Sequence, residues 1–337
     1  MRLAVAGLGF MGSTHLKALR NVPGVELVAV LSRDEKKLAG DLTGTAGNLG
    51  GPGECFDFSQ VRKYRDLASA LADPGIEALD ICLPSDLHES WALEALRHGK
   101  HVLVEKPMAL DGTACDRMIH EARQQRRVLM VAQVLRFFPA YRALVSALKT
   151  GELGAVRGGI FRRRCARPFW SDWLPDRARS GGGVFDLLIH DVDMALHLFG
   201  APEAIAATGH ENIEIGVDLI SARLFYGSGL VVEIEGGWYH AGFPFSMEYT
   251  VVADGGTLDY NSALSSPRRY GADGPGEDLP LKGDDGYAAE IAYFAQCCQS
   301  GEEPVLCRPE ESAAAVRLTR AIEQARRRNG EKIPCQS

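Results

Sequence analysis

The N-terminal segment LAVAGLGFMG constrains the fold of this chain more than any other part of it. An apolar strand over residues 2–6 runs directly into a GxGxxG pattern, and helical spacing continues over residues 11–20. In this setting Gly7 permits a tight turn, Gly9 lets the backbone approach a pyrophosphate, and Gly12 lets the helix pack closely on the strand. The helix N-terminus would face the negative charge. The segment therefore predicts a dinucleotide site with cofactor contacts at Gly7, Gly9, Phe10, Met11 and Gly12.

Short apolar runs recur along the first part of the chain, and helical patterns separate them, as buried parallel strands in βα units require. These runs lie at residues 27–31, 79–83, 101–104 and 128–132. We therefore expect residues 1–134 to form an α/β domain with a Rossmann, doubly wound parallel sheet that binds NAD(P). Within it, residues 40–58 are rich in glycine, threonine and asparagine and predict a long loop.

The pattern changes after this domain. Segments such as VRGGIFRRR, VDLISARLFY and LVVEIEGGWYH lie close together in the sequence and predict antiparallel strands. A chain of 337 residues with 46% hydrophobic content can bury two cores. Residues 135–337 are therefore predicted to form a C-terminal α+β domain with a large, mostly antiparallel open sheet, used for substrate binding and oligomerisation. In this domain we expect helices over residues 140–149, 287–299 and 309–328, and a loop over residues 258–286.

The charge and the apolar runs exclude two kinds of partner. A net charge of -7 and a pI near 5.8 offer no basic field, so neither nucleic acid nor a membrane surface is expected to bind. Met1 and Arg2 are followed by four apolar residues and a glycine, which is far short of a signal h-region, so no secretion signal is expected. No run approaches the ~18 apolar residues of a membrane span. We expect a cytoplasmic protein with a small-molecule substrate. The eight cysteines include no CxxC pattern and are expected to be reduced and structural.

The residues after the second predicted strand bear on the choice between NAD and NADP. An NAD-preferring site usually carries an acid about twenty residues after the glycines, where it binds the ribose 2′-hydroxyl. This chain has Ser32 and Arg33 there, and their hydroxyl and guanidinium suit a 2′-phosphate. NADP is therefore favoured as the cofactor, and NAD stays possible. In the alternative interpretation Arg33 is a solvated loop charge and Asp34 binds the ribose.

Ionisable residues recur at helical spacing in GGGVFDLLIHDVDMALHLFG. Asp186, His190, Asp193 and His197 fall at i, i+4, i+7 and i+11, so they would line one face of a single helix. The intervening residues are apolar enough to bury the rest of the helix, which makes such a face costly and indicates a site. Lys106, in VLVEKP, ends a predicted strand at the edge of the sheet where open α/β folds bind ligands.

Four segments together resemble the Gfo/Idh/MocA family of oxidoreductases: GLGFMG, LPSDLHESWALEAL, VLVEKP and SGGGVFDLLIHDVD. The resemblance spans nearly the whole chain. It implies a Rossmann domain, a second domain whose open sheet often mediates homodimers or homotetramers, and a sugar or polyol site between the two. By position, Lys106 matches the lysine of the family's EKP motif, and Asp186 and His190 match its D-x-x-x-H helix.

The same resemblance implies further contacts. Asp193 matches an aspartate that binds substrate hydroxyls in the inositol dehydrogenase branch of the family. Pro84, Ser85 and His88 match the segment beside the nicotinamide ribose, although Ser85 is also a natural helix N-cap. With the residues already named, the predicted cofactor site is completed by Ser32, Arg33, Pro84, Ser85, His88, Glu105 and Lys106.

Oxidation of a secondary alcohol needs a base for the hydroxyl proton and an acceptor for the hydride. We predict His190 as the base, Asp186 as the group that orients its imidazole, and Lys106 as the group that stabilises the alkoxide. Two alternatives compete with these catalytic roles. Asp186 and His190 would form an ordinary polar pair on an exposed helix face, or would bind zinc together with Asp193. Because no cysteine cluster or HxxxH spacing accompanies them, no metal is predicted.

The predicted substrate contacts are Lys106, Arg136, Trp170, His190 and Asp193. Arg136 is alternatively a structural ion-pair partner, and Trp170, like Trp173, alternatively fills a hydrophobic core. Arginines at 162, 163, 164 and 167 hint at an acidic or phosphorylated sugar, but strand alternation turns some of them away from any one face. Structural or solvated roles are expected for His15, His197 and the arginines at 326–328.

We therefore expect an NAD(P)-dependent oxidoreductase that moves a hydride between nicotinamide C4 and a carbinol carbon of a sugar, inositol or related polyol. Two other functions fit the same resemblance. One is an enzyme that cleaves glycosidic bonds with a tightly bound NAD, and the other is a non-catalytic dinucleotide-binding regulator. Retention of Lys106, Asp186 and His190 argues against the regulator. Fold alone does not decide which sugar or polyol is used.

Overall fold

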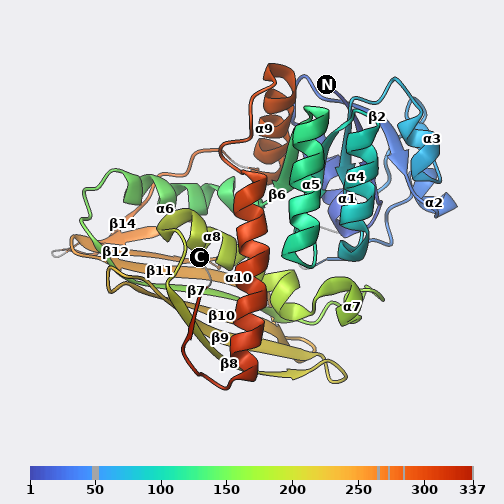
Figure 1. Cartoon of the computed structure of the whole chain (residues 1–337). Coiled ribbons are helices and arrows are strands. Elements are labelled where there is room, and N and C mark those ends of the chain that lie inside the picture. The colour runs from blue at the N-terminus through green and yellow to red at the C-terminus, as the bar shows by residue number, and fades with distance from the viewer. Residues whose placement is uncertain (48–52, 264–265, 272–273, 284, 336–337) are drawn as a thin grey trace.

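The computed structural model describes residues 1–47, 53–263, 266–271, 274–283 and 285–335. Figure 1 shows two sheets side by side, each with helices packed against it. The long helix α10 (Pro309–Arg327) runs along both parts of the molecule and contacts helix α5 of one and strand β8 of the other. Within the described residues, no helix combines the length and the apolar character needed to cross a membrane.

A parallel sheet of six strands forms the core of the N-terminal part, with the order β3-β2-β1-β4-β5-β6. This order confirms the predicted doubly wound Rossmann arrangement. In β1, Leu3 and Val5 pack into the clusters on the α1 side, whereas Ala4 and Ala6 pack into the cluster on the α4 and α5 side. The strands are β1 (Arg2–Ala6), β2 (Glu26–Leu31), β3 (Arg62–Tyr64), β4 (Ala78–Ile81), β5 (His101–Glu105) and β6 (Leu129–Ala132).

The helices of this part are short and lie on both faces of the sheet. They are α1 (Phe10–Leu19), α2 (Glu35–Leu38), α3 (Leu67–Leu71), α4 (His88–Arg97), which follows the 3-10 turn η1 (Ser85–Leu87), and α5 (Gly112–Gln125). Strand β3 was not expected, because its sequence RKY is polar and lies at the sheet edge. Of the loop predicted over residues 40–58, residues 48–52 lie outside the described residues. The rest is irregular apart from a bridge between Asp41 and Cys55.

A nine-stranded sheet forms the C-terminal part, with the order β14-β13-β12-β11-β7-β10-β9-β8-β15. Its paired neighbours are antiparallel except for β10 with β7, which confirms the prediction of a mostly antiparallel sheet. The strands are β7 (Val156–Ala166), β8 (Ala204–Asn212), β9 (Val217–Phe225), β10 (Val231–Tyr239), β11 (Ser246–Ala253), β12 (Gly256–Asn261), β13 (Arg268–Tyr270), β14 (Glu277–Asp278) and β15 (Ile333–Pro334).

The prediction of a loop over residues 258–286 was wrong in part. It overlaps β12, and β13 and β14 extend the sheet further within it. Glycine and proline between these strands hid them, because the strands are short and lie toward the sheet edge, where few apolar residues are needed. Residues 264–265, 272–273 and 284 of the same stretch lie outside the described residues.

The remaining helices follow the last strand of the first sheet along the chain. They are η2 (Val134–Arg136), α6 (Pro139–Lys149), α7 (Arg177–Ser180), the π-helical turn η3 (Val184–Leu188), α8 (Ile189–Phe199) and α9 (Gly286–Ser300). Helix α9 packs on α1, and its Ile291 and Phe294 share a core cluster with Leu3 of the first sheet. A helix from the end of the chain therefore helps to cover the N-terminal sheet, and the division at residues 134 and 135 stays a prediction.

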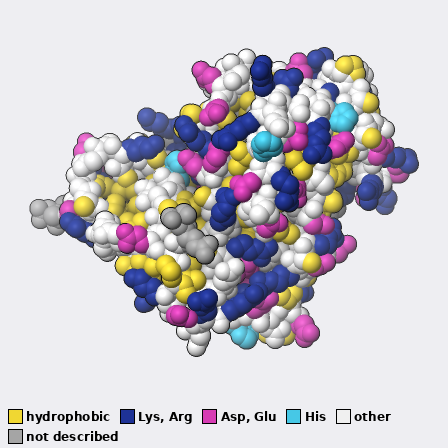
Figure 2. All heavy atoms as spheres, in the orientation of Figure 1, with side chains coloured by type: hydrophobic (Ala, Val, Ile, Leu, Met, Phe, Trp, Pro, Cys, Tyr) yellow, Lys and Arg dark blue, Asp and Glu magenta, His cyan; other side chains and the backbone are white. Residues whose placement is uncertain are grey.

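Helix α10 is attached to the first part by charged side chains. Arg317 pairs with Asp116, and Arg123 pairs with Glu310. Figure 2 shows basic and acidic side chains interspersed over this face of the molecule. None of the eight cysteines, which all lie among the described residues, forms a disulfide.

Candidate active site

A cavity of about 400 Å³ lies between the two sheets. Its first wall is formed by the segments that follow β1, β4 and β5, and its second wall by η3, α8 and the stretch between β7 and α7. Residues of the first wall include Gly7, Gly9, Phe10, Met11, Lys37, Cys82, Leu83, Pro84, Ser85, Glu105, Lys106 and Tyr287. Residues of the second wall include Pro168, Trp170, Asp172, Trp173, Leu174, Asp186, Leu187, His190 and Phe245.

The glycines of the N-terminal pattern shape a cradle at the first wall. Gly7 has a φ of +94°, and a Cβ there would lie 2.4 Å from the Cys82 carbonyl oxygen. A Cβ on Gly12 would lie 1.9 Å from the Gly7 carbonyl oxygen, so this glycine serves close packing and does not line the cavity. A Cβ on Gly9 would meet nothing within 4 Å. Open space at Gly9, beside the uncapped N-terminus of α1, fits the pyrophosphate of a dinucleotide.

The segment after β2 brings one cation, Lys37, to the same cavity, whereas the predicted cofactor residues Ser32 and Arg33 are not among its lining residues. The Asp34 carboxylate accepts the backbone N–H groups of Lys36 and Lys37 and caps helix α2. Both N–H groups bond to the same oxygen, Oδ1, so the alternative in which Asp34 binds the ribose stays open. Arg33 is exposed and Lys37 lines the cavity. Sequence reasoning missed Lys37, although its position one helical turn after Arg33 is a signal that could have found it.

Two segments meet at the inner end of the cavity. Pro84 and Ser85, which the family resemblance places beside the nicotinamide ribose, both line it. His88 does not line the cavity, because its buried ring lies between the carbonyl oxygens of Pro107 and Leu83, 2.7 and 2.8 Å from its two nitrogens. His88 therefore ties the loop after β4 to the loop that follows Lys106.

Lys106 and Asp186 both line the cavity and pair with each other. The Lys106 Nζ atom donates to the backbone oxygen of Asp186 at 2.6 Å and to its carboxylate Oδ1 at 3.2 Å. The other carboxylate oxygen accepts the Nε1–H of the buried Trp238 at 3.2 Å. With side chains only 14% and 19% exposed, Lys106 and Asp186 form a fixed, partly desolvated pair at the wall of the cavity.

His190 lies beside this pair and also lines the cavity. Its Nδ1 atom is buried and has no hydrogen-bond partner among the described residues. Burial, followed by the charges of Lys106 and Arg163, lowers the pKa of His190 well below its usual range. The ring is therefore neutral near pH 7 and able to accept a proton.

The hydrogen bonds of Asp186 differ from the predicted ones. Its carboxylate is held by Lys106 and Trp238, and no hydrogen bond joins it to His190 in the described residues. The reason is the π-helical turn Val184–Leu188, which is wider than an α-helical turn, so residues four apart are not stacked along it. The prediction from α-helical spacing therefore placed Asp186 and His190 at the site but was wrong to expect that they contact each other.

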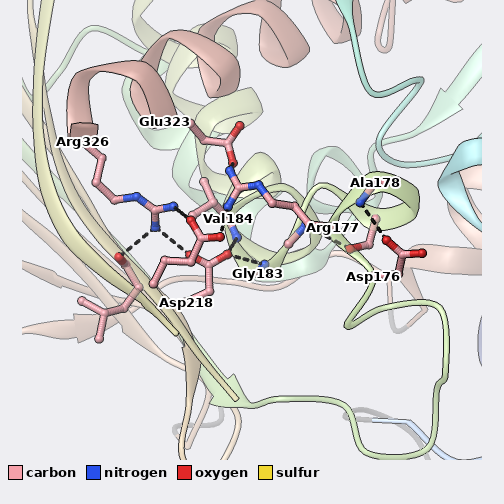
Figure 3. Close-up of polar contacts among 12 residues, drawn as sticks. Asp176, Arg177, Ala178, Gly183, Val184, Asp218, Glu323 and Arg326 are labelled. Carbon is pink, nitrogen blue, oxygen red and sulfur yellow. Dashed lines mark hydrogen bonds and ion pairs between the residues drawn. The ribbon is translucent and has the colours of Figure 1, made fainter. Parts of the chain in front are cut away.

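The triple glycine before this turn has a specific partner. Gly181 and Gly182 have φ values of +81° and +88°, and a Cβ on Gly182 would lie 2.7 Å from an oxygen of the Asp218 carboxylate. That same oxygen accepts the N–H groups of Gly183, at 2.7 Å, and Val184, at 3.4 Å (Figure 3). Asp218 on β9 thus holds the start of the turn that presents Asp186.

Asp218 is held in turn by Arg326 of helix α10, which donates to its second oxygen at 2.6 Å and to the Leu219 carbonyl oxygen at 3.2 Å (Figure 3). Arg326 also pairs with Glu211 at 2.6 Å. Its side chain is only 7% exposed, which confirms a structural role for this member of the 326–328 run. Sequence reasoning missed Asp218, because an aspartate within an alternating strand carries no local signal.

Arg136 and Asp193 lie away from the cavity. They form a two-pronged ion pair at 2.6 and 2.8 Å, each side chain is 1% exposed, and Arg136 also pairs with Glu311 of α10. Beyond the π-helical turn, this face of α8 points toward α10, and His197 lies 4.0 Å from Glu311 there. The arrangement matches the alternative in which Arg136 is a structural ion-pair partner, and it corrects the expectation that Arg136 and Asp193 lie with Lys106 and His190.

His15 belongs to a buried cluster beneath the first wall. Its Nδ1 lies 2.8 Å from an Asp80 oxygen and its Nε2 lies 3.1 Å from a Glu105 oxygen. Although burial opposes the charge, the Asp80 carboxylate raises the pKa of His15 well above its usual range. The cluster extends to Cys82, whose thiol lies 3.5 Å from His15 Nδ1. Potential metal ligands among the described residues, His15, Asp80 and Cys82, thus already bond to one another.

Comparisons with known proteins agree with this geometry. A family profile described as an oxidoreductase family with an NAD-binding Rossmann fold, GFO_IDH_MocA, matches residues 1–133. A second profile, described as the GFO/IDH/MocA C-terminal domain, matches residues 141–259.

Two relatives and one solved structure are similar over most of their length. A Haloferax volcanii protein named D-xylose 1-dehydrogenase (NADP(+)) 2 is 29% identical, over 93% of this chain and 95% of that protein. A Saccharopolyspora erythraea protein named inositol 2-dehydrogenase 2 is 28% identical, over 90% and 86%. The crystal structure of aldose-aldose oxidoreductase from Caulobacter crescentus, complexed with glycerol, has a TM-score of 0.85 at 22% identity and covers 99% of both chains.

Proposed function

The chain belongs to the Gfo/Idh/MocA family of oxidoreductases, and on this premise we propose that it transfers a hydride between nicotinamide C4 and a carbinol carbon of a sugar, inositol or related polyol. One observation carries the proposal. The glycine cradle and Lys106 on one wall of the cavity, and Asp186 and His190 on the other, enclose a single space, in which burial keeps His190 neutral near pH 7. A cofactor and an alcohol fit together in such a space.

Each group of the site has a task in alcohol oxidation. A bound nicotinamide dinucleotide supplies the hydride acceptor. His190 accepts the hydroxyl proton, and Lys106 stabilises the negative charge on the oxygen as the C–H bond breaks and the C=O bond forms. Asp186, whose carboxylate accepts the Trp238 N–H, holds the Lys106 ammonium in place. The substrate carbon loses two electrons with the hydride, and reduction reverses each step.

The proposal is tested by a screen of neutral sugars and cyclic polyols with NADP+ and NAD+, followed at the absorbance band of the reduced nicotinamide. We expect turnover with at least one polyol. Denaturation of the purified protein and quantification of any released cofactor accompany the screen. A cofactor retained in stoichiometric amount, with no net change of absorbance during turnover, would contradict simple dehydrogenation.

The proposed preference for NADP predicts the effect of removing the two cations. Replacing Arg33 and Lys37 together with alanine should weaken NADP+ binding by about 100-fold, since each charge-assisted contact contributes roughly 1.5 kcal/mol, or about tenfold. NAD+ binding should change little, because it lacks the 2′-phosphate. Calorimetry of both cofactors measures this. Lys36→Ala is the matched control, because it removes the same charge at the position next to Lys37. Equal affinities of the native protein for NAD+ and NADP+ would contradict the preference.

The state of His190 predicts how the rate depends on pH. Burial and the charges of Lys106 and Arg163 lower the pKa of His190 well below 6.5. The imidazole therefore stays uncharged as the pH falls to 6.5. The kcat for oxidation should therefore hold until the pH is below 6.5 and then fall as the ring gains a proton. A pH–rate profile shows this, and His190→Asn should abolish the acid limb at a low residual rate. An acid limb of the native enzyme centred above 6.5 would contradict the assignment.

A homodimer or homotetramer also stays a proposal. The nine-stranded sheet is covered by α8 and α10 on one face, and the opposite face of β7 exposes Ile160 among paired charges such as Arg162 with Glu235. This face is the expected interface between copies. Light scattering of the purified protein gives the oligomeric state.

A further inference from the structure

The second wall of the cavity has a distinctive chemistry. Its apolar part comes from Trp170, Trp173 and Phe245, together with Pro168, Leu174 and Leu187. Its charged part consists of two carboxylates, Asp172 and Asp186, while His190 is neutral near pH 7. Among the lining residues, the cation nearest to this wall is Lys106, which is already paired with Asp186.

The arginines in front of the cavity do not change this balance. Arg162 and Arg164 lie on the outer face of the sheet, where both pair with Glu248. Arg163 points inward but is buried against Asp191 at 2.8 Å. Arg167 donates to the Ile213 carbonyl oxygen at 2.8 Å, and none of the four lines the cavity.

The aromatic part of the wall is held in place by its own turns. The Trp173 carbonyl oxygen accepts the Asp176 N–H at 3.1 Å, and the Leu174 carbonyl oxygen accepts the Ser180 hydroxyl at 2.6 Å. Trp170 is still 41% exposed, so its ring is open to a ligand. Flat aromatic rings beside Lys106 suit the apolar C–H face of a sugar ring or an apolar substituent on it.

We propose that the cavity selects an uncharged sugar or cyclic polyol with an apolar face or substituent, and that it rejects phosphorylated sugars and sugar acids. This inference rests on the proposed function and names its class of substrate. A phosphate or carboxylate at the second wall would face the Asp172 carboxylate and the Asp186 carboxylate, of which only Asp186 has a cation, Lys106, as its partner. The other lysine that lines the cavity, Lys37, belongs to the first wall, at the cofactor end, so like-charge repulsion opposes entry of an anion at the second wall.

The test compares probes that share one ring and differ in charge, each offered to the protein saturated with its cofactor. D-Glucose and phenyl β-D-glucoside are the neutral probes, and glucose 6-phosphate and glucuronate are the anionic ones. Calorimetry measures binding, and nicotinamide absorbance measures turnover. We expect the neutral probes to bind at least ~10-fold more tightly than the anionic ones, with the phenyl glucoside tightest.

Variants of the wall make the test specific. Trp170→Ala and Trp173→Ala should each weaken binding of phenyl β-D-glucoside by about 5- to 10-fold. Phe169→Ala is the matched control and should change nothing, because Phe169 is 57% exposed and does not line the cavity. Asp172→Lys should narrow the difference between glucose and glucose 6-phosphate, because it replaces a repelling charge by an attracting one.

The outcomes separate this inference from the proposed function. Binding of an anionic probe as tightly as its neutral counterpart, unchanged binding in both tryptophan variants, or no binding of any probe would overturn the inference. Turnover of an anionic sugar would overturn it too and leave the hydride-transfer function standing. Selective binding of neutral probes, without nicotinamide reduction by any sugar or polyol, would support the inference and contradict the function.

Discussion

Replacing Lys106 with methionine is expected to lower kcat/KM for the alcohol substrate by about three orders of magnitude, the range seen when a group that stabilises developing charge is removed. Lys106 is held by the Asp186 carboxylate and backbone oxygen in a partly buried place, where water cannot substitute well for its ammonium group. Methionine keeps most of the volume of the side chain, so the fold should persist. Steady-state kinetics with a substrate from the screen measures the loss.

Two further variants identify the cause of this loss. Lys106→Arg keeps the positive charge but not the ability to give up a proton, and it should recover only part of the activity if the proton matters. Trp238→Phe removes the N–H that holds Asp186 and should lower kcat/KM by about tenfold, in line with the loss of one hydrogen bond to a charged group. Activity of Lys106→Met within tenfold of the native value would rule out the assigned role, provided that calorimetry shows unchanged cofactor binding.

Replacing Asp218 with alanine is expected to lower the free energy of unfolding by about 3–5 kcal/mol, the cost of removing one partner of a buried ion pair. Asp218 is fully buried, and its loss leaves Arg326 with Glu211 as its remaining carboxylate partner and leaves the Gly183 N–H without an acceptor. Urea denaturation, followed by the fluorescence of the buried Trp238, reports on the sheet that contains β9.

The control for this prediction is Asp254→Ala. Asp254 also forms a two-pronged pair with an arginine, Arg157, but both side chains are largely exposed. Because solvent screens exposed ion pairs, Asp254→Ala should change the free energy of unfolding little. Asp218→Asn keeps an acceptor for Gly183 and should be milder than Asp218→Ala. If Asp218→Ala and Asp254→Ala unfold alike, the buried network does not stabilise the start of η3.

Much of the fold could be predicted because its signals are local. The apolar runs around β1, β4 and β5 are buried on both faces, and this kind of strand needs no information from distant residues to be recognised. Strand β3 and the outer strands β13 and β14 were missed because they lack such local signals. Polar strands at or near a sheet edge are specified by their neighbours in the sheet.

The candidate site divides in the same way. Gly7, Gly9, Lys106, Asp186 and His190 were predicted from motifs and line one cavity, although the chemical role of each stays a prediction. Lys37 was missed at the cofactor end. Arg136 and Asp193 were placed with the site on helical spacing, but a π-helical turn and the contact with α10 place them in a separate buried pair.

The sequence by itself determined the parallel sheet, the glycine cradle and the residue types at the site, because strand burial, turn conformation and helix spacing depend on residues close together along the chain. The tertiary structure alone decided the partners. Lys106 meets Asp186 across 80 residues, and Arg326 meets Asp218 across 108. Ion pairs and hydrogen bonds have a range of a few ångströms, so only the folded chain decides which of many candidate charges are neighbours.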